Sequence, residues 1–214
     1  MENSGINHHY LNRMGRIILF SAEEVLGPTA VNAVLNLAGL ADYTGNYQNS
    51  NSTMEFPFAH ISRLHVALEE FYGPHGGRGV ALRIGRASFQ HILRDYGPPF
   101  GLTDLAFRLL PMRARLRVGA TAFADIFNKH TDQRIRVEDR DGQILWHIDI
   151  CPYCWGRSLL TDQPHTVVCQ MAVGLLQEAL YWVSGGKYYG VEEIQCIAKG
   201  DLTCTIAIDK TPMG

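Results

Sequence analysis

The sequence predicts an α+β domain, in which a helical N-terminal part packs on an antiparallel sheet of two hairpins. Two observations lead to this prediction. Apolar residues recur at helical spacing over most of the chain up to residue 129. From residue 134 onward, apolar and polar residues alternate in two pairs of short segments, and a long apolar helical pattern separates the pairs. Helices followed by antiparallel strands are typical of the α+β class.

The composition limits the classes of protein to which this chain can belong. The chain has 214 residues, 46% of them hydrophobic and 19% charged, which are globular values. We expect a polar N-terminal lead-in over residues 1–15 and a single domain over residues 16–214. A net charge of -2 gives no case for a nucleic-acid partner.

The apolar runs are too short for a membrane span or a signal peptide, so we expect a cytoplasmic protein. Under reducing conditions, the five cysteines are better explained as metal ligands than as disulfides.

The first part of the chain is expected to begin with a short strand at Arg16–Phe20. The capping box Ser21–Glu24 predicts the start of a helix, and Pro28 is placed to open the next one. Residues 42–58 are predicted to form a loop, because asparagine, serine and glycine are frequent there.

Apolar periodicity predicts four further helices, at residues 59–72, 80–96, 102–110 and 112–129. The segment Gly73–Gly79 is expected to break the helical pattern between the first two. Pro111 separates the last two.

The last third is expected to contain both hairpins. Asp141-Gly142 marks the turn of the first, and Ile144, Trp146 and Ile148 share one face of its second strand. Pro164 opens a long helix that ends near residue 185. Residues 188–197 and 203–208 form the second hairpin.

Four side chains near the C-terminal end are candidate metal ligands. Cys196 and Cys204 are symmetric about Gly200, so a hairpin places them side by side. Cys169 begins the preceding helix, and Glu193 supplies a carboxylate if a bulge turns it to the same face as Cys196. A competing set has the familiar Cys-x-x-Cys spacing and consists of Cys151, Cys154, Cys196 and Cys204. Spacing alone leaves both sets open, together with a third reading in which the cysteines are small apolar core residues.

A combined spacing pattern resembles the 4-vinyl reductase domain family, which includes a bacteriochlorophyll-synthesis protein, archaeal hydrocarbon-binding proteins and the sensor domains of phenol-responsive transcription activators. The pattern runs Cys151-x2-Cys154, Cys169-x4-Gly174, Gly186-Lys187 and Glu193-x2-Cys196-x3-Gly200-Asp201-x2-Cys204. The resemblance implies a fold shared distantly with TRAPP vesicle-tethering subunits, a homodimer and a structural Zn²⁺. In the phenol sensors the ligands match Cys169, Glu193, Cys196 and Cys204, so the resemblance favours the first ligand set.

A pocket between the helices and the sheet is the expected functional site. Aromatic candidates for its lining are Phe89, Phe107, Phe123, Phe127, Trp146, Trp155 and Tyr181. His130 could donate to a ligand oxygen, and Arg113 and Arg117 could hold a propionate group.

We therefore expect a zinc-stabilised module that binds a hydrophobic small molecule, most simply a tetrapyrrole of the bacteriochlorophyll pathway, as carrier or sensor. An alternative is an enzyme that reduces a tetrapyrrole vinyl group, although the chain shows no dinucleotide-binding motif. A further alternative is a protein-binding scaffold.

Overall fold

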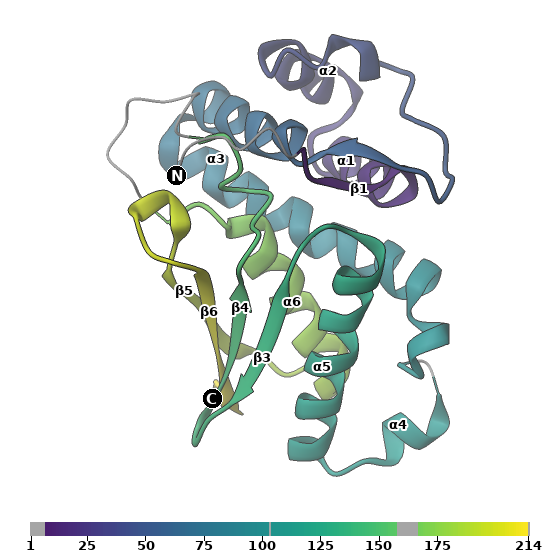
Figure 1. The fold of residues 1–214 in the computed structure, drawn as a ribbon, viewed down its shortest axis with the longest axis vertical. Coiled ribbons are helices and arrows are strands. Elements are labelled where there is room, and N and C mark those ends of the chain that lie inside the picture. Colours follow the sequence, from purple (N-terminus) through teal and green to yellow (C-terminus); the bar gives the residue numbers. More distant parts are fainter. Residues whose placement is uncertain (1–6, 103, 158–166, 214) are drawn as a thin grey trace.

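The computed structural model describes residues 7–102, 104–157 and 167–213. Its helices are α1 (Asn12–Leu26), α2 (Pro28–Leu37), α3 (Phe58–Tyr96), α4 (Leu105–Leu109), α5 (Met112–His130) and α6 (Gln170–Ser184). Its strands are β1 (His9–Leu11), β2 (Met54–Pro57), β3 (Ile135–Asp139), β4 (Gln143–Ile148), β5 (Tyr189–Gln195) and β6 (Cys204–Pro212). Figure 1 shows helices on one side of an antiparallel sheet, so the predicted α+β class is confirmed.

The larger sheet joins the two predicted hairpins edge to edge. Its strand order is β3-β4-β6-β5, and all three pairings are antiparallel. The pairing of β4 with β6 sets Trp146 opposite Ile206 and Ile148 opposite Cys204. This register brings the chain that follows β4 next to the beginning of β6.

Helix α6 packs between the sheet and α3, and two glycines permit a very close approach of α3 and α6. A Cβ atom on Gly85 of α3 would lie 2.0 Å from the Met171 carbonyl oxygen. A Cβ atom on Gly174 of α6 would lie 2.0 Å from the Leu82 carbonyl oxygen. The two backbones are therefore in direct contact at this crossing, and neither position has room for a side chain.

Helix α3 spans both halves of the molecule. The break predicted over Gly73–Gly79 is confined to one residue, Gly73, whose φ of 76° interrupts the helical path. The helix resumes at Pro74 because proline is compatible with the first turn of a helix. Helix α3 packs against α1, α2 and α6. Its C-terminal half contacts both α1, where His91 packs on Phe20, and α6, where Gly85 meets Met171. Figure 1 shows α3 running through the centre of the molecule.

Helix α1 corrects two expectations for the N-terminal part. The residues predicted as a strand, Arg16–Phe20, lie inside this helix, and so does the predicted capping box. The buried positions Met14, Ile17, Ile18, Ser21 and Ala22 follow helical spacing. Helical periodicity that extends on both sides of Ile17 therefore overrides the β-branched composition of the short segment.

Strands β1 and β2 form a small second sheet where a lead-in and a loop were expected. Tyr10 pairs with Phe56, and its side chain is 1% exposed. Tyr10 also forms a bridge to Thr131, and the His9 amide donates to the Asp132 carboxylate at 2.7 Å. The segment before residue 16 thus ties the helical part to the start of the larger sheet. The start of the predicted long helix, Pro164, lies outside the described residues.

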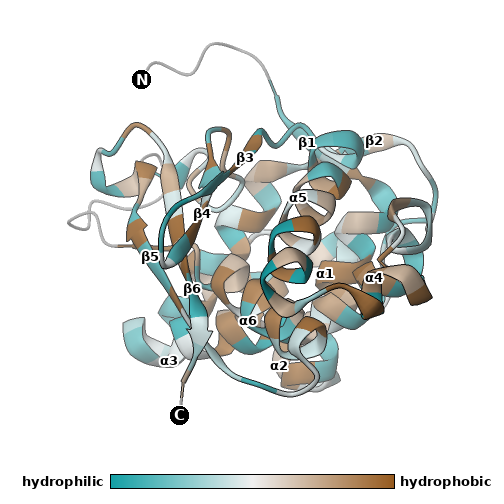
Figure 2. Cartoon of the chain, turned by 90° about the horizontal axis from the view of Figure 1, so that it is seen from below, coloured by the Kyte–Doolittle hydropathy of each residue, from teal (hydrophilic) through white to brown (hydrophobic). Residues whose placement is uncertain are grey.

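One hydrophobic core connects the two halves, and it includes buried residues from Tyr10 in β1 to Ile208 in β6. Figure 2 shows hydrophobic residues concentrated along α6 and on the inner sides of the surrounding helices. Within the part of the chain that the structure describes, no helix is both long and apolar enough to cross a membrane.

Candidate functional site

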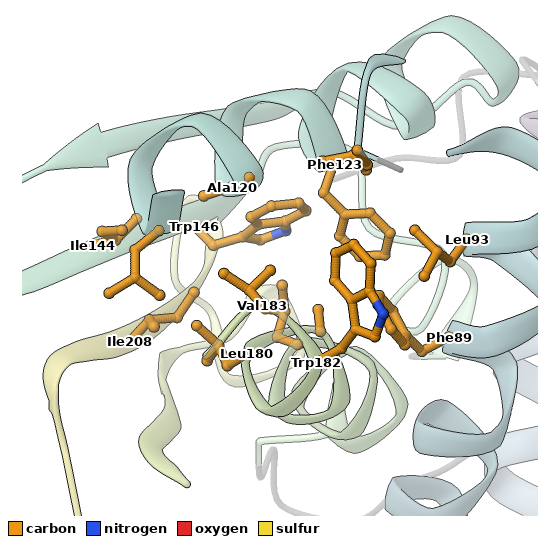
Figure 3. A pocket seen from close by; sticks show the side chains of 15 residues that line it. Phe89, Leu93, Ala120, Phe123, Ile144, Trp146, Leu180, Trp182, Val183 and Ile208 are labelled. Carbon is orange, nitrogen blue, oxygen red and sulfur yellow. The ribbon is translucent and has the colours of Figure 1, made fainter. Parts of the chain in front are cut away.

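An apolar cavity lies between α3, α5, α6 and the sheet. Its lining consists of hydrocarbon and indole side chains together with one glycine: Phe89, Leu93, Leu102, Leu116, Gly119, Ala120, Phe123, Ile144, Trp146, Leu176, Ala179, Leu180, Trp182, Val183 and Ile208. Figure 3 shows that Trp146 approaches from the sheet, Phe123 from α5, and Trp182 and Val183 from α6. Helical and strand periodicity together produce this lining, because each element turns one apolar face inward.

Aromatic contacts close the cavity. Phe123 packs against Trp146 with ring centroids 6.1 Å apart, and Phe89 packs edge-on against Phe123 at 5.8 Å. Trp182 stacks on Phe107 of α4 at 6.2 Å and an interplanar angle of 13°. This aromatic pair attaches the short helix α4 to the cavity wall, and the Arg115 guanidinium of α5 donates to the Arg108 and Leu110 carbonyl oxygen atoms at the end of α4.

The cavity is small in this conformation, with a volume of about 40 Å³. A cavity of about 150 Å³ holds benzene in another protein. The present cavity therefore has to widen before an aromatic ring can enter it.

The structure separates the predicted pocket residues into two groups. Phe123 and Trp146 line the cavity, and Phe89, also a candidate, joins them. The other seven candidates lie outside the lining. Phe107 stacks on Trp182, and Tyr181 packs on Tyr188. The remaining five are Phe127, His130, Trp155, Arg113 and Arg117.

Each of these five has other surroundings. Phe127 packs edge-on against Phe123, and His130 packs on Tyr96. Trp155 contacts His8, Arg113 is exposed, and Arg117 pairs with Asp139 at 3.6 Å. Sequence reasoning did not select Trp182, although it lies one position after the candidate Tyr181 on a helix whose apolar face had been recognised.

A second candidate site is a cluster of all five cysteines and Glu193. Two sets of donor atoms lie within 4.8 Å of one another: Cys151, Cys154, Cys169 and Cys204, and also Cys169, Glu193, Cys196 and Cys204. The Sγ atoms of Cys151 and Cys169 are 3.4 Å apart. The structure thus brings together every thiol that the two competing sequence-based sets contain.

Three segments position the cluster. Cys151 and Cys154 lie in the turn after β4, and Cys169 is the residue before the first turn of α6. Cys196 directly follows β5, and Cys204 begins β6. The register that pairs Ile148 with Cys204 brings the first segment to the third.

Glu193 reaches the cluster because β5 is irregular. The pairing of β5 with β6 shifts register between Glu193 and Gln195, which is the irregularity that this residue needs to share a face with Cys196. Glu193 is 6% exposed, and its Oε2 accepts a hydrogen bond from the Cys169 amide at 2.8 Å. Burial raises the pKa of its carboxyl group.

The thiols perturb one another strongly. Burial raises the pKa of Cys151 to about 11 and raises that of Cys169 well above its usual value. Hydrogen bonds from the neighbouring thiols lower the pKa of Cys154. Cys154 is the half-buried member of the group.

Comparison with solved structures identifies the fold. An H-NOX protein from S. oneidensis in the Fe(II)NO ligation state matches with a TM-score of 0.57 and 13% identity, over 93% of this chain and 99% of that one. A structure from a study of heme distortion in the H-NOX family matches with a TM-score of 0.58 and 11% identity, over 94% and 95% of the two chains. The phenol-responsive sensory domain of the transcription activator PoxR, with phenol, matches with a TM-score of 0.53 and 18% identity, over 83% and 88%. The chain has the fold of the H-NOX proteins.

This finding corrects the family suggested by the cysteine spacing. No protein-family model and no curated protein matches the sequence. The similar structures are H-NOX proteins and a phenol sensory domain, so the assignment to the 4-vinyl reductase family is wrong. The expected similarity to phenol-sensor domains is confirmed at the level of the fold.

The prediction of a structural Zn²⁺ is also corrected. It depended on the family resemblance, whereas the matching H-NOX structures are described by heme and by iron ligation states. Spacing motifs of cysteine recur in unrelated folds, so a pattern without a matching family cannot specify the metal.

Heme itself does not fit the cavity of this H-NOX-like fold. Heme iron requires an axial histidine, cysteine, methionine or tyrosine, and no such residue is found among the described residues that line the cavity. The lining also contains no cationic side chain for the propionates, and the volume of about 40 Å³ is far too small for a porphyrin.

Proposed function

We propose that this chain is a binding domain that holds a small, uncharged, apolar molecule in the cavity and acts as a sensor of it. The observation that carries the proposal is an apolar cavity lined by hydrocarbon side chains and two indole rings at the junction of three helices and the sheet. An occupant there would contact elements from both parts of the molecule. The fold shared with the PoxR sensory domain supports the sensor role.

Helix α4 supplies a route of access to the cavity. It has only five residues, and its Leu105 and Leu109 side chains are 71% and 75% exposed. Its buried member, Phe107, stacks on Trp182. Movement of this aromatic pair would widen the cavity, and the hydrogen bonds from Arg115 to the end of α4 would have to adjust with it.

The chemistry of the lining argues against the alternatives. A reductase needs groups that deliver protons and electrons, and the cavity residues include no titratable side chain. A tetrapyrrole is much larger than the cavity, and Arg113 and Arg117 lie outside its lining. A cytoplasmic location and a homodimer stay predictions from the sequence.

Toluene is a suitable probe, because it has the shape of an aromatic ring and no polar group. Its binding should change the fluorescence of Trp146 and Trp182, which line the cavity, and Trp155→Phe removes the tryptophan that lies outside it. Ala120→Leu fills the cavity and should weaken toluene binding by roughly tenfold or more.

Ala122→Leu is the matched control, because Ala122 lies on the same helix outside the lining and is also half-buried. Equal binding by both variants, or no binding of toluene by the parent chain, would overturn the proposal. In the second case the protein-binding scaffold would become the better explanation.

A further inference from the structure

Cys154 is the thiol that the first sequence-based ligand set leaves out, yet the structure places it against two members of that set. Its Sγ lies 3.6 Å from Cys196 Sγ and 3.4 Å from Cys204 Sγ. The Sγ of Cys169 lies within 4.8 Å of each of these three sulfur atoms. These four sulfur atoms are therefore all within 4.8 Å of one another.

Such a group has the dimensions of a tetrahedral metal site. A metal–thiolate bond of about 2.3 Å places the sulfur atoms of a tetrahedron about 3.8 Å apart. We propose that Cys154, Cys169, Cys196 and Cys204 form an all-thiolate site for a thiophilic divalent metal ion. On binding, the four thiols would release their protons to solvent, and each sulfur would donate an electron pair to the ion.

Glu193 and Cys151 are competing ligands, because each belongs with Cys169 and Cys204 to a set of donor atoms within 4.8 Å of one another. Three points favour Cys154 over Glu193. The Glu193 carboxylate is already held by the Cys169 amide at the start of α6, where the helix dipole stabilises a negative charge. Thiophilic ions prefer a fourth thiolate to a carboxylate. Cys154 also already contacts two of the three other sulfur atoms.

If Cys154 is the fourth ligand, Glu193 does not contact the metal. It instead accepts a hydrogen bond from the Cys169 amide at the beginning of α6 and so positions Cys169. Its second oxygen, Oε1, is buried without a hydrogen-bond partner among the described residues, so it is the atom that would ligate the metal if the proposal were wrong. This oxygen gives the experiment a definite alternative.

Backbone contacts prepare the hairpin for thiolates. The Ile197 amide donates to Cys204 Sγ at 3.3 Å, and the Cys196 amide donates to Asp201 Oδ2 at 2.8 Å. The first contact favours a charged sulfur, and the second orders the turn between the two cysteines. A bound ion would join three segments: the turn after β4, the start of α6 and the β5–β6 hairpin.

The test uses the full, reduced chain titrated with Co²⁺ in the absence of oxygen. Co²⁺ reports the number of thiolate ligands, because sulfur-to-metal bands gain intensity with each thiolate and d–d bands move to shorter wavelength when oxygen replaces sulfur. We expect one Co²⁺ per chain with a four-sulfur spectrum. Cys154→Ser should shift the bands and weaken Co²⁺ binding. The loss of affinity should exceed the roughly 10- to 100-fold that follows when a residue hydrogen-bonded to a metal ligand is removed.

Two variants serve as controls for Cys154→Ser. Cys151→Ser changes a thiol in the same turn and should leave the spectrum unaltered. Glu193→Gln should keep the four-sulfur spectrum, with a loss of affinity no larger than that range. Far-UV circular dichroism establishes that each variant is folded.

X-ray absorption by the Co²⁺-loaded parent chain counts sulfur and oxygen neighbours without any substitution. Four sulfur neighbours exclude the glutamate set even if Cys154→Ser fails to fold, and an unaltered spectrum in Cys151→Ser then excludes the set that contains Cys151. Three sulfur atoms and one oxygen, or a spectral shift in Glu193→Gln but not in Cys154→Ser, would overturn it in favour of the glutamate set. Failure to bind Co²⁺ would also overturn it, and would leave the separate proposal for the apolar cavity intact.

Discussion

His60 is a titratable side chain whose surroundings keep it neutral. Its ring packs edge-on against Phe56 with centroids 5.4 Å apart, and its Nδ1 lies 3.2 Å from the Tyr43 hydroxyl. Burial, with contributions from Arg63 and His9, lowers its pKa from 6.5 to about 4. Between these two values the unfolded chain binds a proton that the folded chain does not. The free energy of unfolding should therefore decrease as the pH falls through this window.

Urea unfolding at about pH 7 and about pH 5 measures this contribution. His60→Gln should lose less stability between the two pH values than the parent chain does. His75→Gln, at an exposed position of α3, is the control and should behave like the parent. If His60→Gln shows the same loss on acidification as the parent, the buried imidazole does not contribute to the pH dependence.

The cysteine cluster shows how far individual residues can be placed from sequence. The approach of Cys196 to Cys204 could be predicted, because a hairpin symmetric about Gly200 requires it. The meeting of Cys151 and Cys154 with the same atoms could be proposed from the Cys-x-x-Cys spacing, but the sequence could not decide it. It depends on the pairing of Ile148 with Cys204 across strands β4 and β6, and alternation within a strand does not reveal which hairpin edges pair.

At the scale of elements, the crossing of α3 and α6 makes a sharp prediction. Gly85 and Gly174 lie where a Cβ atom would meet carbonyl oxygen atoms of the facing backbone at 2.0 Å. Gly174→Ala must push the helices apart and disturb the core on both sides. We expect it to lower the free energy of unfolding by about 3 kcal/mol or more. Urea unfolding followed by circular dichroism measures the change.

Gly79→Ala is the matched control in α3, because a Cβ atom there would meet nothing within 4 Å. Alanine is the better helix former, so this substitution should raise the free energy of unfolding by about 0.5–1 kcal/mol. If Gly79→Ala and Gly174→Ala both raise the free energy of unfolding, then intrinsic helix propensity, rather than the close crossing of α3 and α6, determines the change in stability.

Elements with clear periodicity and end signals were predictable. Asp141-Gly142 identified the first hairpin, and Pro111 separated α4 from α5. The small sheet of β1 and β2 was missed because each strand is too short for a pattern, with three and four residues. Its stability comes from tertiary contacts of Tyr10 and Phe56, which a local window cannot show.

For the whole molecule, the sequence predicted the α+β arrangement but only part of the cavity. Trp146 and Phe123 were recognisable as aromatic residues on inward faces. The contribution of Trp182 depends on the rotation of α6 about its axis, which the close crossing with α3 determines. Which of several buried aromatic residues surround a cavity is thus a property of packing between elements.

The connectivity of the core predicts that the described chain unfolds as one unit. Helix α3 packs against both α1 and α6, and the hydrophobic core runs continuously from the N-terminal helices to the sheet. Urea unfolding should therefore give coincident transitions by far-UV circular dichroism, which reports all helices, and by tryptophan fluorescence. Fluorescence reports the C-terminal part and its contacts with the helices, because Trp146, Trp155 and Trp182 all lie in the C-terminal part of the sequence. Gly174→Ala should move both curves equally. Separate midpoints would instead mean that the helical N-terminal part and the sheet are independent domains.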